Sequence, residues 1–166
     1  MDASLPPTTR WSTTPVDTHS GTLAHVSEQT GTFYERVGGH ETFVQLIHVF
    51  YEGVADDPTL RAMYPEEDLG PAEERLLLFM EQYWGGPKTY SETRGHPRLR
   101  MRHASFAVTP AQRDRWLHHM HAAIDTLDMA APEEAELREY VTRAAQFMVN
   151  AEDEPGNQSP TQLPIV

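Results

Sequence analysis

The clearest pattern in the chain is a set of apolar residues that recur three or four positions apart between residues 40 and 54. They are Phe43, Leu46, Ile47, Phe50, Tyr51 and Val54. This spacing places all of them on one face of an α-helix. Gly38-Gly39 before the segment and Asp57-Pro58 after it are helix breakers. The pattern therefore predicts a helix over 40–54 and a short turn over 58–64.

Three later segments show the same helical period. The first begins at Pro71, a residue suited to the first position of a helix, and ends before Gly85-Gly86-Pro87. The second begins with a capping-box signature formed by Thr109 and Gln112, and the third runs from about Pro132 to Asn150. In chain order, their predicted inner faces are Leu76, Phe79, Met80 and Tyr83; Trp116, Met120, Ala123, Ile124 and Leu127; and Leu137, Val141, Ala144, Ala145 and Met148.

The segment between the first two of these helices is polar. Residues 88–95 predict a loop, and a short helix is expected to follow from about Pro97. No segment alternates between apolar and polar residues as a half-buried strand would. The predicted fold class is therefore all-α.

The two ends of the chain differ from its middle. Residues 1–30 are rich in Thr, Ser and Pro without apolar period, and residues 151–166 have a similar composition. Such segments bury too little apolar surface to offset the entropy of ordering. We expect a flexible N-terminal arm over 1–30, one compact domain over 31–150 and a flexible C-terminal tail over 151–166.

Composition narrows the functional classes. The formal net charge is -12, and the chain has no cysteine. An acidic protein is a poor match for nucleic-acid phosphates or for an anionic membrane surface. The absence of cysteine excludes disulfides and thiolate chemistry, and no apolar stretch has the length of a membrane helix or a signal peptide. The expectation is a cytoplasmic protein without nucleic-acid or membrane partners.

Most motifs of enzymatic chemistry are missing from the sequence. It contains no glycine-rich phosphate loop, no zinc-binding His-Glu-x-x-His helix and no paired Glu-x-x-His motifs. His118, His119 and His121 lie close together, but an exposed polar helix face explains them better than a metal site. His19, His25, His40 and His48 have no partner at ligand spacing, and we expect surface or capping roles for them.

His103 differs from the other histidines in its surroundings. Leu99 lies four residues earlier, so the two share a helix face, and Arg98, Arg100 and Arg102 surround them. An imidazole on an apolar stripe beside arginines suits the ligand of a buried metal centre that carries anionic groups. Haem offers both an iron that needs an axial imidazole and two propionates that need cations. On these residues alone, a hydrogen-bonded core histidine remains the alternative.

At these residues the sequence resembles the truncated haemoglobins, specifically the second group of the family (group II, or O type). The resemblance covers roughly residues 33–150. Its motifs are Phe33-Tyr-Glu-Arg-Val-Gly-Gly39, Phe50-Tyr51, Met63-Tyr64-Pro65, Ala72-Glu-Glu-Arg75-Leu76, Gln82-Tyr-Trp-Gly-Gly-Pro87, Arg94-Gly-His-Pro-Arg-Leu-Arg-Met-Arg-His103 and Trp116. The family's fold is a shortened globin, a two-over-two helical sandwich, and this resemblance makes 31–150 a truncated globin domain.

The resemblance also implies roles for individual residues. His103 would be the proximal ligand of the iron of haem b (iron protoporphyrin IX). Leu76, Phe79 and Leu99 would line the pocket, and Arg75, Tyr90 and Arg102 would contact the propionates or the haem edge. Tyr51, Tyr64 and Trp116 would lie on the distal side. Ala72 falls where longer globins place a distal histidine, so polar donors must come from elsewhere. Without the resemblance, Tyr51 and Trp116 would be assigned to an ordinary core.

The first functional hypothesis is a globin that reversibly binds oxygen and other diatomic ligands, with high affinity from tyrosine and tryptophan donors. The alternative is a haem enzyme that carries out nitric oxide dioxygenation or peroxidase chemistry, and a distant alternative is a haem-free helical interaction module. The sequence does not choose among oxygen transport, nitric oxide removal, redox chemistry and sensing. A reductase partner and a homodimer are compatible with each of the haem hypotheses.

Overall fold

The computed structural model describes residues 30–153, in which every regular element is helical. The elements are α1 (Phe33–Arg36), α2 (His40–Asp56), α3 (Pro58–Arg61), α4 (Gly70–Tyr83), α5 (Thr89–Arg94), α6 (Leu99–His103), α7 (Pro110–Ile124) and α8 (Ala131–Met148). The all-α prediction is confirmed. Residues 1–29 and 154–166 lie outside the described residues, and with them nearly all of the predicted arm and tail.

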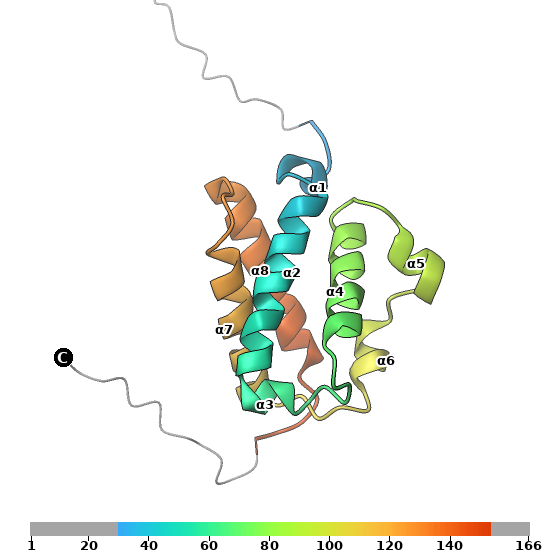
Figure 1. The fold of residues 1–166 in the computed structure, drawn as a ribbon, viewed down its shortest axis with the longest axis vertical. Coiled ribbons are helices and arrows are strands. Elements are labelled where there is room, and N and C mark those ends of the chain that lie inside the picture. The colour runs from blue at the N-terminus through green and yellow to red at the C-terminus, as the bar shows by residue number, and fades with distance from the viewer. Residues whose placement is uncertain (1–29, 154–166) are drawn as a thin grey trace, which may run out of the picture.

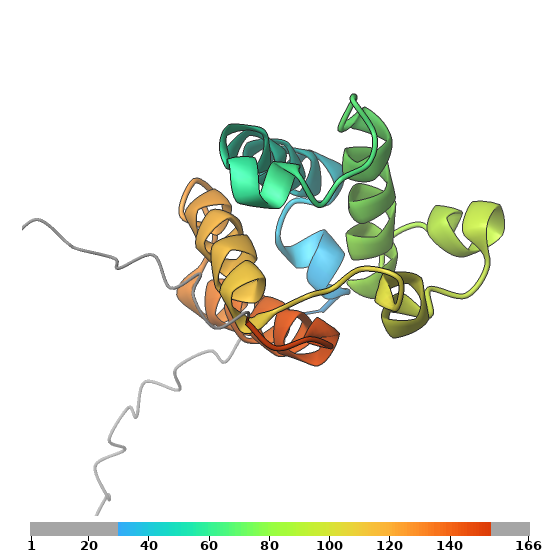
Figure 2. The ribbon, with the colours of Figure 1, turned by 90° about the horizontal axis from the view of Figure 1, so that it is seen from below.

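Four long helices form the body of the molecule. α2 packs against α4 and against α7, and α7 packs against α8 (Figure 1). This is the two-over-two arrangement, with the α2–α4 pair on the α7–α8 pair. Seen from below, α6 lies across the bundle from α2 and α7 (Figure 2). The core holds most residues of the predicted inner faces, including the fully buried side chains of Phe43, Phe50, Met120, Leu137 and Val141.

The long helices begin and end close to the predicted positions. The capping box of α7 is present: the Thr109 hydroxyl accepts from the Gln112 amide, and the Gln112 side chain accepts from the Thr109 amide at 2.9 Å. After α4, Gly85 has a φ of +93°, and a Cβ there would lie 2.6 Å from Cβ of Thr32. This close approach explains why a glycine ends the helix.

Three local predictions were wrong. The predicted loop over 88–95 contains α5, whose Ser91 amide and hydroxyl are both bound by the side chain of Gln82 at 2.9 and 2.6 Å. The predicted turn over 58–64 begins with the helix α3. Tyr83, expected on the inner face of α4, is 51% exposed. In the first case a side chain from α4, and in the second a cap, stabilises a short helix that no apolar period reveals.

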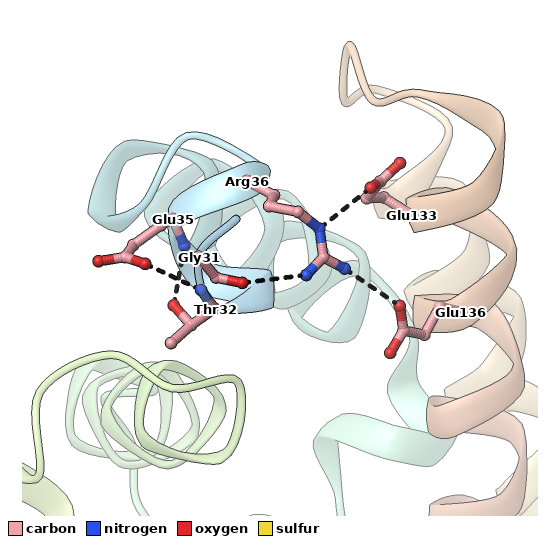
Figure 3. Close-up of polar contacts among 6 residues, drawn as sticks. All are labelled: Gly31, Thr32, Glu35, Arg36, Glu133 and Glu136. Carbon is pink, nitrogen blue, oxygen red and sulfur yellow. Dashed lines mark hydrogen bonds and ion pairs between the residues drawn. The ribbon is translucent and has the colours of Figure 1, made fainter. Parts of the chain in front are cut away.

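The short helix α1 is joined to α8 by one arginine. The Arg36 guanidinium donates to Glu133 at 3.2 Å, to Glu136 at 3.5 Å and to the Gly31 carbonyl at 3.4 Å (Figure 3). The capping box of Thr32 and Glu35 begins α1, and Phe33 packs on Trp84 with ring centroids 4.0 Å apart. These contacts connect α1 to both helix pairs.

A buried carboxylate connects α2, α3 and α7. Asp57, only 7% exposed, accepts from the amides of Thr59 and Leu60 and caps α3. It also binds Arg115 at 3.0 Å and His119 at 3.1 Å. Burial raises the pKa of the Asp57 carboxyl, but the hydrogen bonds from His119, Leu60 and Arg115 outweigh it and bring the pKa to about 2. Gly53 makes room for this network, because a Cβ there would lie 2.5 Å from Nδ1 of His119.

We expect Asp57→Asn to lower the free energy of unfolding by about 2 kcal/mol near neutral pH, because a buried charged acceptor is lost. The folded-state pKa lies below the ordinary value of 3.8, so this stabilisation is present above that value and is lost as the pH falls toward 2. Urea unfolding at neutral and acid pH measures the difference. Asp56→Asn is the control, because Asp56 is exposed. If the difference in the free energy of unfolding between Asp57→Asn and the native chain did not shrink in acid, Asp57 would not have the lowered pKa described here.

Candidate functional site

A cavity of about 520 Å³ lies between the helices, bounded by α2, α4, α6, α7 and α8. Its volume falls within the range of small-molecule and cofactor sites. All the residues named as site candidates from the sequence line this one cavity: Tyr51, Tyr64, Ala72, Arg75, Leu76, Phe79, Tyr90, Leu99, Arg102, His103 and Trp116. The fold thus brings together residues that are up to 65 positions apart in the chain.

His103 lines the cavity from α6 and is oriented by its own helix. Its Nδ1 lies 2.8 Å from the carbonyl oxygen of Leu99. A carbonyl only accepts hydrogen bonds, so Nδ1 carries the proton in the neutral imidazole and Nε2 keeps its lone pair. This is the arrangement by which proteins orient a metal-ligating histidine. His103 therefore has one ring nitrogen free to bind a metal.

Side-chain contacts to the backbone hold α6 in place at both ends. Arg102 donates to the carbonyls of Pro97 and Arg94, both at 2.9 Å. The Asn150 side chain donates to the carbonyls of His103 and Phe106 at 3.2 and 3.0 Å. The position of His103 is therefore fixed by the segments before and after it as well as by α8.

Three side chains with polar hydrogens line the cavity from α2, α7 and the segment after α3. The Tyr51 and Tyr64 rings meet edge to face with centroids 5.9 Å apart, and Trp116 lies 5.1 Å from Phe50. Burial raises the pKa of Tyr51, and the neighbouring Tyr64 raises it further; burial also raises the pKa of Tyr64. Both phenols therefore keep their protons well above neutral pH and can act as hydrogen-bond donors.

The remaining candidates form an apolar wall and a charged rim. Phe79 and Tyr90 pack edge to face at 5.7 Å, and buried Ala72 provides no polar group. At the rim, Arg75 binds Glu66 at 3.1 Å. Arg102 lines the cavity, but Arg98 and Arg100 do not. The expectation that all three arginines around His103 meet an anion at the site is therefore wrong for Arg98 and Arg100.

Sequence reasoning missed part of the cavity wall. Tyr140, Val141, Ala144, Ala145 and Met148 line it from α8, and Gln112 and Arg113 line it from α7. The residues of α8 follow a helical apolar stripe, which is the same pattern that an ordinary core produces. Gln112 was assigned only to the helix cap. Nothing in the sequence pattern separates a cavity wall from a filled core.

Several other histidines have local partners, while His19 and His25 lie outside the described residues. His40 binds Glu81 at 2.6 Å, and this hydrogen bond raises the pKa of His40. His48 binds Glu73 at 3.1 Å. His119 was expected on an exposed face but is turned to Asp57, with its side chain 19% exposed. Among residues 30–153, no group of three His, Asp or Glu side chains could hold a metal ion.

The cavity fits haem on the chemistry of its residues. It offers one imidazole with a free nitrogen, walls that are mostly apolar, and guanidinium groups from Arg75 and Arg102 at its edge. A planar apolar ring with an iron at its centre and carboxylates at its rim needs these three features.

Comparison with known proteins agrees with this chemistry. The family model described as "Bacterial-like globin" matches residues 32–150. The "Group 2 truncated hemoglobin YjbI" of Bacillus subtilis is 39% identical over 121 residues, which are 70% of this chain and 87% of that protein. The "Group 2 truncated hemoglobin 3-1" of Lotus japonicus is 37% identical over 114 residues, 67% of this chain and 68% of that protein.

Solved structures show the same likeness. A thermostable hemoglobin from the actinobacterium Thermobifida fusca has 65% sequence identity and a TM-score of 0.71, with 72% of this chain and 98% of that chain covered. A truncated oxygen-avid haemoglobin from Bacillus subtilis has 37% identity and a TM-score of 0.68, with coverage of 72% and 100%. None of the helices described here has the length and apolar character needed to cross a membrane.

We expect Tyr51 and Tyr64 to stay protonated in the folded protein at about pH 10, where an exposed tyrosine ionises. When the folded protein is titrated through that pH, its phenolate absorbance in the near ultraviolet rises. We expect Tyr51→Phe to leave the size of this rise unaltered. In concentrated urea, the same substitution should remove one tyrosine from the titration. Loss of a native-state titration step near that pH in Tyr51→Phe would show that the Tyr51 hydroxyl is not buried as described.

Proposed function

Because the chain belongs to the bacterial-like globin family and, within it, to the group 2 truncated haemoglobins, we propose that it binds haem b through His103 and reversibly binds oxygen with high affinity. The globin family implies a haem cofactor. The observation that carries the proposal is the 2.8 Å contact between Nδ1 of His103 and the Leu99 carbonyl, which leaves the lone pair of Nε2 available to a metal in the cavity that His103 lines.

The residues around the cavity divide into three roles in this proposal. His103 would hold the iron from one side, and the hydrogen bond to Leu99 would fix the rotation of its ring. Leu76, Phe79 and Leu99 would exclude water from the ring faces. Arg75, Tyr90 and Arg102 would bind the two propionates. Two N–H groups of Arg102 donate to backbone carbonyls, and its other N–H groups would be available to a propionate.

Haem, when bound, would supply an iron that can take a diatomic ligand. Tyr51, Tyr64 and Trp116 would donate hydrogen bonds to that ligand. Each such bond contributes about 0.5–1.5 kcal/mol, and about 1.4 kcal/mol corresponds to a tenfold change. Two or three donors would therefore slow the escape of oxygen by about ten- to a thousandfold.

The cavity supports oxygen binding better than peroxidase chemistry. Efficient cleavage of peroxide needs a side chain that accepts and returns a proton near the bound ligand. Among the cavity-lining residues that the structure describes, His103 is the only histidine, and the single carboxylate, Glu66, is bound to Arg75. The raised pKa values of Tyr51 and Tyr64 keep both phenols protonated near neutral pH, so neither can accept a proton from peroxide. Slow release of oxygen, in a cavity with no side chain suited to proton transfer, favours ligand binding, sensing or reaction of bound oxygen with nitric oxide.

We expect His103→Ala to abolish stable haem uptake, because the side chain that binds the iron is removed. The measurement is the absorption spectrum of purified protein titrated with haem, then reduced and exposed to air. His118→Ala is the matched control, since His118 is an exposed histidine on α7. If His103→Ala took up haem and formed the same oxygenated spectrum as the native chain, the proposal would fail.

We expect Trp116→Leu and Tyr51→Phe each to raise the oxygen dissociation rate by about tenfold, because each removes one hydrogen-bond donor. Phe79→Leu changes the cavity wall without removing a donor and should leave the rate within about twofold. Stopped-flow mixing of the oxygenated protein with an oxygen scavenger measures the rates. Equal effects of all three substitutions would mean that packing, not donation, controls release.

A further inference from the structure

Positive charge is concentrated in one stretch of this acidic chain. Five of its 13 Lys and Arg residues lie between positions 94 and 113, and that stretch contains no Asp or Glu. The net charge of the whole chain is -12. The stretch that contains α6 therefore has the opposite sign from the chain as a whole.

Two of these arginines point away from the haem cavity. Arg98 and Arg100 are exposed and line a surface groove between α6 and α8, together with Arg143, which comes from α8. Within residues 30–153 neither Arg98 nor Arg100 has a carboxylate within ion-pair distance. Arg143 has only Glu139, at 3.8 Å, with both side chains about 70% exposed. Three arginines thus face one nearby carboxylate, so the groove keeps a net positive charge.

The same groove has an exposed apolar surface. Met101, Phe147 and Tyr83 are 68%, 57% and 51% exposed. The Arg100 guanidinium lies over the Phe147 ring, 5.0 Å from its centroid. Met, Arg and aromatic residues are the types enriched in protein interfaces. We call the surface formed by Tyr83, Arg98, Arg100, Met101, Arg143 and Phe147 the α6–α8 groove.

The α6–α8 groove and the haem cavity share a wall. Leu99, Tyr140, Ala144 and Met148 line both of them. Tyr83 in the groove stacks on Tyr140 with ring centroids 4.0 Å apart. Met101 lies two residues before His103 on the same short helix. A molecule seated in the groove would be separated from the contents of the cavity by a single layer of side chains.

We propose that the α6–α8 groove is the docking site of an acidic electron-donor protein. This proposal rests on the proposed function, since the electron acceptor is the haem. One electron would leave the donor and convert ferric iron to ferrous, and no covalent bond would form or break. Charge complementarity provides attraction and orientation, and electron-transfer partners commonly use small interfaces.

The backbone conformation of Arg98 allows a variant that removes its charge without straining the fold. Arg98 is the one non-glycine residue with positive φ in the described chain, at φ 40° and ψ 47°. A glycine adopts this conformation without strain. Arg98→Gly therefore removes a groove charge without an expected loss of folding. Arg100→Glu reverses a second charge, and Lys88→Glu makes the same change in charge at an exposed position outside the groove.

The test uses the full chain loaded with haem and a reduced flavodoxin of strongly negative net charge as the probe. Stopped-flow absorbance follows the reduction of ferric haem at low and high salt. Amide chemical shifts of the labelled globin during titration with the flavodoxin report binding independently of reduction. We expect the reduction rate and the affinity to fall as salt rises, and both to fall at least about tenfold in Arg100→Glu and about threefold in Arg98→Gly. Lys88→Glu should stay within about twofold, and dithionite should reduce all four proteins equally.

Three results would overturn the proposal. Equal losses in Lys88→Glu and Arg100→Glu would indicate an effect of total charge. Unaltered rates in both arginine variants, or shifts confined to amides outside α6 and α8, would exclude this surface. A dimer of the native chain that Arg100→Glu dissociates, seen by sedimentation, would assign the groove to a second copy. Failure of haem uptake would refute the proposed function instead, and the amide shifts would still decide where the flavodoxin binds.

Discussion

The hydrogen bond between Nδ1 of His103 and the Leu99 carbonyl connects the local structure of α6 to the chemistry of the cavity. It requires four residues of helical geometry, because only then does the carbonyl lie beneath the imidazole. It also decides which ring nitrogen carries a proton and which can bind a metal. The rest of the fold serves this arrangement by holding α6 across the bundle from the helices that carry Tyr51 and Trp116 (Figure 2).

Polar contacts outside the cavity hold the helices around it in position. Asp57 joins the end of α2 to α7, Arg36 joins α1 to α8, and Asn150 joins the end of α8 to the residues after α6. Each of these side chains makes two or more hydrogen bonds. These contacts position the ends of the helices that surround the cavity.

Much of the fold could be predicted from the sequence because α2, α4, α7 and α8 are amphipathic and have recognisable breakers or caps. The apolar period of α2 and the capping box of α7 depend on neighbouring residues only. α5 could not be predicted, because this six-residue helix depends on the Gln82 side chain and on the burial of Tyr90. The site residues named from the family resemblance all line one cavity, but Tyr140 and Gln112 were missed since wall and core share one pattern. Arg98 has a left-handed backbone that no periodicity reveals, and neither Arg98 nor Arg100 lines the cavity.

The cavity and the α6–α8 groove lie on two sides of one short helix, α6. His103 lines the cavity and Met101 lines the groove. Everything proposed for either side depends on whether the imidazole of His103 binds iron. The most direct test is a crystal structure of the chain reconstituted with haem. We expect the iron to be bound by Nε2 of His103, with Nδ1 still donating to the Leu99 carbonyl. Iron bound by another side chain, or haem seated outside the cavity, would contradict this.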